Sequence, residues 1–174
     1  MLNAEARYWE LVRVIRRQET PVLRYHREGE RVEIGAAGDA VPYVCISHVW
    51  SDGLGNPRGN EMNACQLDRV KQVVNRLYDD KLNENQDPIL WWLDTLCVPK
   101  GEAYRREEQE TVAKMKAIYT QAQKVLLFDS GLSACNDPSD VLEILARFRL
   151  SNVCTLSEHA VFHLVKCHEN PCPF

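Results

Sequence analysis

Polar side chains gather where an apolar segment ends, in the stretch YVCISHVWSDGLGNP at residues 43–57. His48 could donate to a phosphate or a ribose hydroxyl, and Trp50 could stack on a planar ring such as adenine. The structural alternatives are an imidazole that caps loop carbonyls, an indole in the core, and Ser and Asp side chains that fix turns. The candidate binding residues in this stretch are Ser47, His48, Trp50, Ser51 and Asp52.

A second polar set accompanies the apolar run ILWWLDTLCV at residues 89–98. Asp94 could hydrogen-bond a ribose or cap the following turn. Cys97 could pair with His48 for nucleophilic hydrolysis, with Asp94 as the orienting group, or could be a buried and unreactive thiol. Just beyond this run, three basic residues could contact a pyrophosphate or form a solvated helix face. These are Lys100, Arg105 and Arg106.

The C-terminal segment offers two further patterns. Thr155 and Glu158 have the Thr-x-x-Glu spacing of a helix capping box. His159, His163 and Cys167 recur every four residues, which would place them on one face of a helix and could suit zinc. Because the paired CxxC spacing of a structural zinc site is missing, we assign no metal site.

The order of the elements predicts that the two polar sets meet. Strands are expected at residues 41–49, 89–98 and 124–129. Helices are expected at 63–77, in the segment that carries Val112 and Tyr119, at 140–148 and at 155–166. A helix at 3–17 and a hairpin at 21–26 and 31–35 come first. Strands that alternate with helices form a parallel sheet between helices, and ligands bind at the carboxyl ends of its strands. Other polar residues expected at that edge are Thr95, Asp129 and Ser130.

Composition narrows the class of protein. The chain has 174 residues, of which 45% are hydrophobic, so we expect one α/β domain over 1–174. The net charge is -4 and both signs are mixed along the chain, so the sequence has no basic patch that would bind nucleic acid. We expect a cytoplasmic protein, because no segment has the length of a membrane span or the order of a signal peptide. The seven cysteines are expected to be buried free thiols.

Several motifs together resemble the heterokaryon incompatibility (HET) domain of fungal self/non-self recognition proteins. They are YVCISHVWSDGLGNPRGN, the helix start CQL, WWLDTLCVPK, MKAIYTQA and VLLFDS, in the family's order between about residues 43 and 129. The resemblance implies a role in programmed cell death when incompatible cells fuse. It divides the domain into an N-terminal helix and hairpin (1–42), core motifs (43–130) and C-terminal helices (131–174). Members of the family commonly continue well beyond this length.

The HET domain is in turn distantly similar to the Toll/interleukin-1 receptor (TIR) domain, a flavodoxin-like three-layer fold with a central parallel sheet. Some TIR domains cleave NAD at the nicotinamide glycosidic bond, using a glutamate in a Trp-Cys-x-x-Glu stretch that is Trp-Thr-Leu-x-Glu in HET domains. Here CTLSE places that glutamate at Glu158, with Cys154 in place of the tryptophan. The resemblance thus implies an NAD glycohydrolase that takes NAD as substrate, needs no cofactor and is a homo-oligomer when active. The alternatives are a non-enzymatic self-association module and the cysteine hydrolase.

Overall fold

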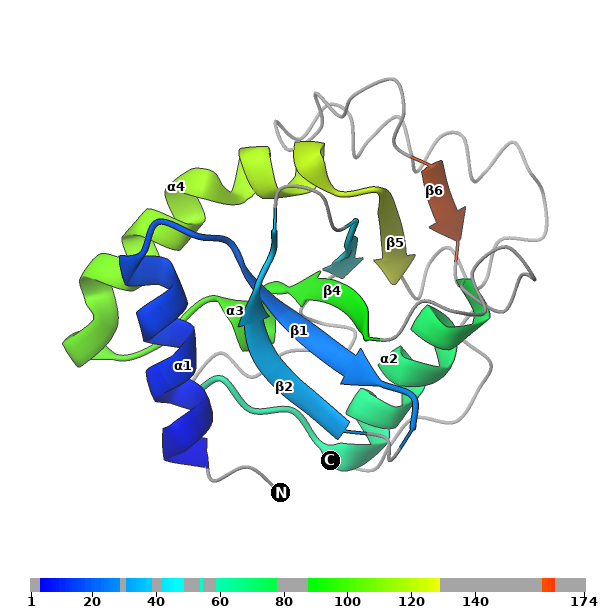
Figure 1. Ribbon diagram of the computed structural model, residues 1–174, viewed down its shortest axis with the longest axis horizontal. Helices are drawn as coiled ribbons and strands as arrows, with labels where there is room; N and C mark the ends of the chain where they lie inside the picture. Colours follow the sequence, from blue (N-terminus) through cyan, green and yellow to red (C-terminus); the bar gives the residue numbers. More distant parts are fainter. Residues whose placement is uncertain are drawn as a thin grey trace.

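The computed structural model describes residues 4–28, 31–38, 42–48, 54, 59–77, 88–128 and 161–164. Within them six strands form one sheet in the order β2-β1-β4-β3-β5-β6 (Figure 1). The strands are β1 (Pro21–His26), β2 (Arg31–Ala36), β3 (Val44–His48), β4 (Ile89–Leu93), β5 (Lys124–Phe128) and β6 (Val161–Leu164). The helices are α1 (Ala4–Arg16), α2 (Ala64–Leu77), α3 (Asp94–Cys97) and α4 (Arg105–Gln121), and a 3-10 turn at Glu102–Tyr104 precedes α4.

The predicted α/β class is confirmed, but the sheet is mixed where we expected it to be parallel. β4, β3, β5 and β6 are parallel neighbours, whereas β1 pairs antiparallel with both β2 and β4. Residues 27–30 join β1 to β2, and two strands joined by so short a connection must be antiparallel. The predicted hairpin is therefore confirmed at the edge of the sheet, and it is hydrogen-bonded into the same sheet as the other strands.

The four parallel strands do not follow one another in space. Numbered along the chain, they lie in the order second, first, third, fourth, so the direction of the chain across the sheet reverses after β4. Right-handed crossovers on the two sides of such a reversal place their helices on opposite faces of the sheet. α2 connects β3 to β4 and α4 connects β4 to β5, so these two helices are expected on opposite faces.

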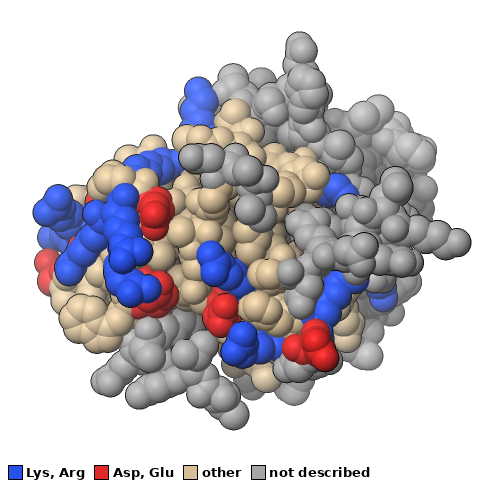
Figure 2. Space-filling view, viewed as in Figure 1, with Lys and Arg blue, Asp and Glu red and all other residues tan. Residues whose placement is uncertain are grey.

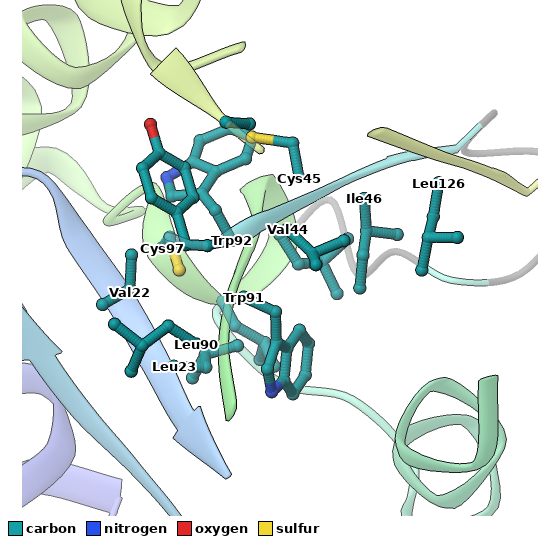
Figure 3. Packing of buried hydrophobic residues seen from close by; sticks show 14 of the residues in the cluster. Val22, Leu23, Val44, Cys45, Ile46, Leu90, Trp91, Trp92, Cys97 and Leu126 are labelled. Carbon is teal, nitrogen blue, oxygen red and sulfur yellow. The ribbon is translucent and has the colours of Figure 1, made fainter. Parts of the chain in front are cut away.

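Helix α2 lies on the face of the sheet that carries the Tyr25 side chain. Asn75 of α2 donates to the Tyr25 hydroxyl at 3.2 Å, and the Lys71 ammonium lies 5.9 Å from the centre of the Tyr25 ring. Leu23, two residues before Tyr25, shares its face and stands opposite Trp91 in the register of β1 and β4. Trp91 therefore faces α2, as Figure 3 shows.

Helix α4 lies on the opposite face of the sheet, which carries the Trp92 side chain. Trp92 follows Trp91 in the strand and points the other way, with its ring 5.6 Å from that of Tyr119 in α4. Tyr43 and Cys45 also approach this helix, because both lie within hydrogen-bond distance of the Ile118 carbonyl. β4 is fully buried between the helices, which explains its continuous apolar sequence ILWWL.

The predicted helix at residues 155–166 is wrong over 161–164, which form the strand β6. β6 pairs with β5 from Lys124 opposite Val161 to Leu127 opposite Leu164. Without it β5 would expose a row of unpaired backbone groups, and Val161 and Phe162 suit a strand. His163 therefore lies in a strand, so the helical spacing proposed for a zinc site with Cys167 does not hold there. The predicted helix at 140–148 lies outside the described residues.

The cysteines only partly follow the prediction. Cys45 and Cys97 are free and buried, as expected, but Cys65 is disulfide-bonded. The prediction of free thiols is therefore wrong at Cys65, because sequence spacing could not show which cysteines the fold brings together. None of the described helices has the length and apolar character needed to cross a membrane.

Helix α1 contacts both α4 and the 3-10 turn that precedes it. Arg16 Nε donates to Glu107 Oε1 at 2.8 Å, and the Tyr8 and Tyr104 rings lie 4.8 Å apart. Basic and acidic side chains lie side by side over these helices in Figure 2. The Glu107 carboxylate is buried, and the hydrogen bond from Arg16 lowers the pKa of this carboxyl.

Replacing Trp92 with alanine should destabilise the domain by about 3–5 kcal/mol, because the indole is fully buried between β4 and α4. The matched control is Trp9→Ala, since Trp9 is 65% exposed and its removal leaves no cavity. Urea denaturation of both variants measures the difference. Equal losses of unfolding free energy would contradict this account of the core.

Glu107→Gln should lower the free energy of unfolding most at neutral pH. A carboxyl whose pKa is lower in the folded state stabilises that state above its unfolded pKa of about 4.3, and this contribution disappears as the pH falls through the folded pKa. The difference between wild type and Glu107→Gln should therefore shrink in acid. Glu102→Gln, at an exposed pair with Arg105, is the control and should show little difference at any pH.

Candidate functional site

His48 and Asp94 meet at the carboxyl ends of two neighbouring strands. β3 and β4 are parallel with Ile46 opposite Leu93, so the residues that follow are adjacent. His48 Nε2 lies 2.8 Å from Asp94 Oδ1. Because a carboxylate only accepts hydrogen bonds, Nε2 carries the hydrogen, and in a neutral ring Nδ1 is then an acceptor. The predicted convergence of these two residues is confirmed.

The two members of the pair differ in exposure. The His48 side chain is 1% exposed and that of Asp94 is 19% exposed. His48 Nδ1 is buried without a hydrogen-bond partner in the described part of the chain. The carboxylate therefore lies nearer to solvent, with the imidazole behind it. The sequence offered both His48 and Asp94 as ligand contacts, and the difference in exposure favours Asp94 for that contact, with His48 as its support.

Asp94 directly follows the last residue of β4 and is the first residue of α3. Its Oδ1 accepts from the Thr95 N–H at 2.6 Å, and its carbonyl accepts from the Val98 N–H at 2.9 Å. An aspartate side chain that bonds the next N–H offers the backbone an alternative to the strand ladder. The predicted strand over 89–98 is therefore too long: β4 ends at Leu93, and Asp94–Cys97 form a helical turn.

Thr95 connects this turn to the segment that follows β3. Its hydroxyl donates to the Leu54 carbonyl at 2.9 Å and lies 3.4 Å from both His48 Nε2 and Asp94 Oδ1. Thr95 lies at the sheet edge as predicted, but the sequence did not indicate these contacts. Two residues that also contact this region, Asn60 and Tyr8, were missed because they are distant in sequence from Thr95.

The remaining predicted residues of the first polar set are placed only in part. Ser47 is half-buried at the end of β3 and, by strand alternation, faces away from His48. Four other predicted residues lie outside the described residues: Trp50, Ser51, Asp52 and Glu158. The same holds for Asp129 and Ser130, although β5 ends at Phe128 directly opposite His48.

Cys97 is fully buried and lies near a second thiol. Burial raises the pKa of the Cys45 thiol well above its ordinary value, and the nearby Cys97 raises it further. Cys45 faces α4, on the side of the sheet opposite to His48. These positions do not favour a thiol and imidazole that act together on a substrate.

Two of the three basic residues beyond β4, Lys100 and Arg105, have carboxylate partners. Lys100 Nζ lies 2.6 Å from Glu108 Oε1, and Arg105 lies 3.3 Å from Glu102. Arg106 is exposed near the start of α4. A pyrophosphate at Lys100 or Arg105 would have to compete with these carboxylates.

A pocket of about 790 Å³ lies at the other end of the parallel strands. Tyr43, which precedes β3, lines it together with residues of α4 such as Lys114 and Ile118. β3 is five residues long, so this pocket is about 16 Å from His48 along the strand. It is separate from the pair of His48 and Asp94.

Thr95→Val should cost about 1–3 kcal/mol of unfolding free energy, because the buried Leu54 carbonyl would lose its donor. Thr95→Ser keeps the hydroxyl and should cost about 1 kcal/mol for the missing methyl group. Urea denaturation compares the two variants. A loss in the serine variant as large as in the valine variant would show that the hydroxyl contributes nothing.

Comparison with known proteins agrees with the motifs. The sequence model of the heterokaryon incompatibility protein (HET) family matches residues 43–160, which is more than half of the chain and includes β3, α2, β4, α3, α4 and β5. No curated protein matches the chain. No solved structure matches it either. The chain belongs to the heterokaryon incompatibility (HET) family.

Proposed function

We propose that this HET domain acts in the cell-death response of heterokaryon incompatibility by hydrolysing NAD at its nicotinamide glycosidic bond. Family membership supports the cell-death role. The observation that carries the proposed binding of a nucleotide is the Asp94 carboxylate, held by His48 at the carboxyl edge of the parallel strands. In open α/β sheets this is the edge where nucleotides bind.

The order of the parallel strands supports a flavodoxin-like, and therefore TIR-like, sheet. Flavodoxin-like sheets have the order 2-1-3-4-5, and β4-β3-β5-β6 corresponds to its first four strands. In such sheets the ligand lies where the strand order reverses, between the first and third strands. Here those strands are β3 and β5, which end opposite each other at His48 and Phe128. Trp50, Ser51 and Asp52 follow β3 closely, as Asp129 follows β5.

Cleavage breaks the bond between the ribose C1′ and the nicotinamide nitrogen, and the electron pair leaves with nicotinamide. The ribose becomes oxocarbenium-like, water adds to C1′, and its proton is released, which gives nicotinamide and ADP-ribose. A carboxylate near C1′ stabilises the developing positive charge, as in glycosidases. We assign this role to Glu158, on the motif CTLSE.

Asp94 suits a second role at the same substrate. A partly exposed carboxylate accepts hydrogen bonds from vicinal ribose hydroxyls, and its orientation is fixed by His48 and by the Thr95 N–H. Because these acceptors are already held in position, less conformational entropy is lost when the substrate binds. Asp94 would therefore hold the ribose, while Trp50 would stack on a base and Ser51 and Asp52 would complete the rim.

The proposal is tested by incubating the purified chain with NAD and measuring nicotinamide release by chromatography, at dilute and at high protein concentration. Glu158→Gln should lower the rate about 10²- to 10⁴-fold. Asp94→Asn should lower kcat/KM about 10- to 100-fold, because an amide is a weaker acceptor for two hydroxyls. Cys97→Ala should keep the wild-type rate.

The matched control for Asp94→Asn is Asp68→Asn, which makes the same change at an exposed carboxylate paired with Lys71 in α2. It should leave the rate unchanged. Loss of turnover in Cys97→Ala but not in Glu158→Gln would instead indicate a cysteine hydrolase. Absence of turnover in wild type at every concentration would overturn the enzymatic proposal in favour of a self-association module.

A further inference from the structure

A buried amide connects the N-terminal helix to the turn that carries Asp94. Asn60 is almost fully buried, and it precedes α2 by only a few residues. Its Nδ2 donates to the Thr95 carbonyl at 3.0 Å and to the Val98 carbonyl at 2.5 Å. Its Oδ1 accepts from the Lys100 N–H at 2.9 Å. Asn60 therefore contacts the backbone at both ends of α3 and just beyond it.

The fourth bond of this amide comes from α1. The Tyr8 hydroxyl lies 2.8 Å from Asn60 Oδ1, is within hydrogen-bond distance of the Lys100 carbonyl, and accepts from the Lys100 N–H at 2.5 Å. The four bonds of Asn60 match the two donors and two lone pairs of an amide. They also fix its orientation, since only the nitrogen can donate to two carbonyls.

The network reaches the candidate site through Thr95. The Thr95 carbonyl is held by Asn60, its N–H donates to Asp94 Oδ1, and its hydroxyl lies 3.4 Å from His48 Nε2. α3 has only four residues, and no side chain caps its start from the preceding position. So short a turn gains little stability from its own hydrogen bonds. Its position depends on the groups that hold it from outside.

We propose that Tyr8 and Asn60 are positioning residues that hold α3 so that Asp94 stays bonded to His48. Helix α1 lies outside the part of the chain that the family model matches, and through Tyr8 it supports the site. Neither residue contacts the pair directly, so each acts through Thr95. The structural part of this inference stands without a substrate, and only its effect on turnover rests on the proposed function.

The chain contains a matched control for each residue. Tyr25 and Asn75 also form a contact between a hydroxyl and an amide, in which Asn75 Nδ2 donates to the Tyr25 hydroxyl at 3.2 Å, between β1 and α2 and away from α3. Tyr8→Phe and Tyr25→Phe each remove one such hydroxyl, and Asn60→Ala and Asn75→Ala each remove one such amide. The phenylalanine variants change a single atom, so the folded state is retained even where the alanine variants unfold.

The experiment measures the Nε2 proton signal of His48 by NMR in protein labelled with ¹⁵N at histidine, and it assigns the signal with His48→Gln. Tyr8→Phe and Asn60→Ala should shift or broaden this signal, and the Tyr25 and Asn75 variants should not. In the nicotinamide-release assay, Tyr8→Phe should lower kcat/KM about 10-fold, because small displacements of a binding group cost rate.

Three results separate the outcomes. A His48 signal that is unchanged in Tyr8→Phe overturns the inference, and so does one that changes equally in Tyr25→Phe, since the effect would then be one of general stability. If wild type releases no nicotinamide, the proposed function fails, and the His48 signal alone still decides whether Tyr8 and Asn60 position the pair.

Discussion

The parallel pairing of β3 with strands on both sides is the constraint on which the rest of the structure depends. The central residues of β3 are fully buried, with β4 on one side of the strand and β5 on the other. Because β4 and β5 follow β3 in the chain but lie on opposite sides of it, α2 and α4 must cover opposite faces. The same pairing brings the ends of three strands together, so His48 lies beside Asp94 on one side and Phe128 on the other.

The two members of the pair differ in burial, and this decides which of them lies nearer to solvent. An imidazole removed from water needs a partner for its polar atoms, and Asp94 supplies one to Nε2. The carboxylate keeps part of its surface in solvent, so of the two side chains it is the one that a ligand from solution would reach first. The sequence suggested both His48 and Asp94 for contact with a ligand because both lie at strand ends, but strand position alone does not show how deep a side chain lies.

The sequence predicted most elements that rest on local patterns and missed those that rest on distant contacts. The runs around Ile46, Trp91 and Leu126 predicted three core strands, because buried parallel strands are continuously apolar. β6 was missed, since its strand form depends on pairing with β5, more than thirty residues earlier. Asn60 was missed for the same reason: it contacts Tyr8, 52 positions away. No periodicity in the sequence reports such a bond.

The physical boundary of the domain differs from the boundary of the family match. The match begins at residue 43, but β1 forms the antiparallel neighbour of β4, and α1 packs on β2 and α4. Without β1, the edge of β4 would present unpaired backbone groups beside two buried tryptophans, and such an edge favours aggregation. Tyr8 adds a polar contact from α1 to the turn that carries Asp94. The segment before residue 43 is therefore a part of the folding unit and of the support of its site.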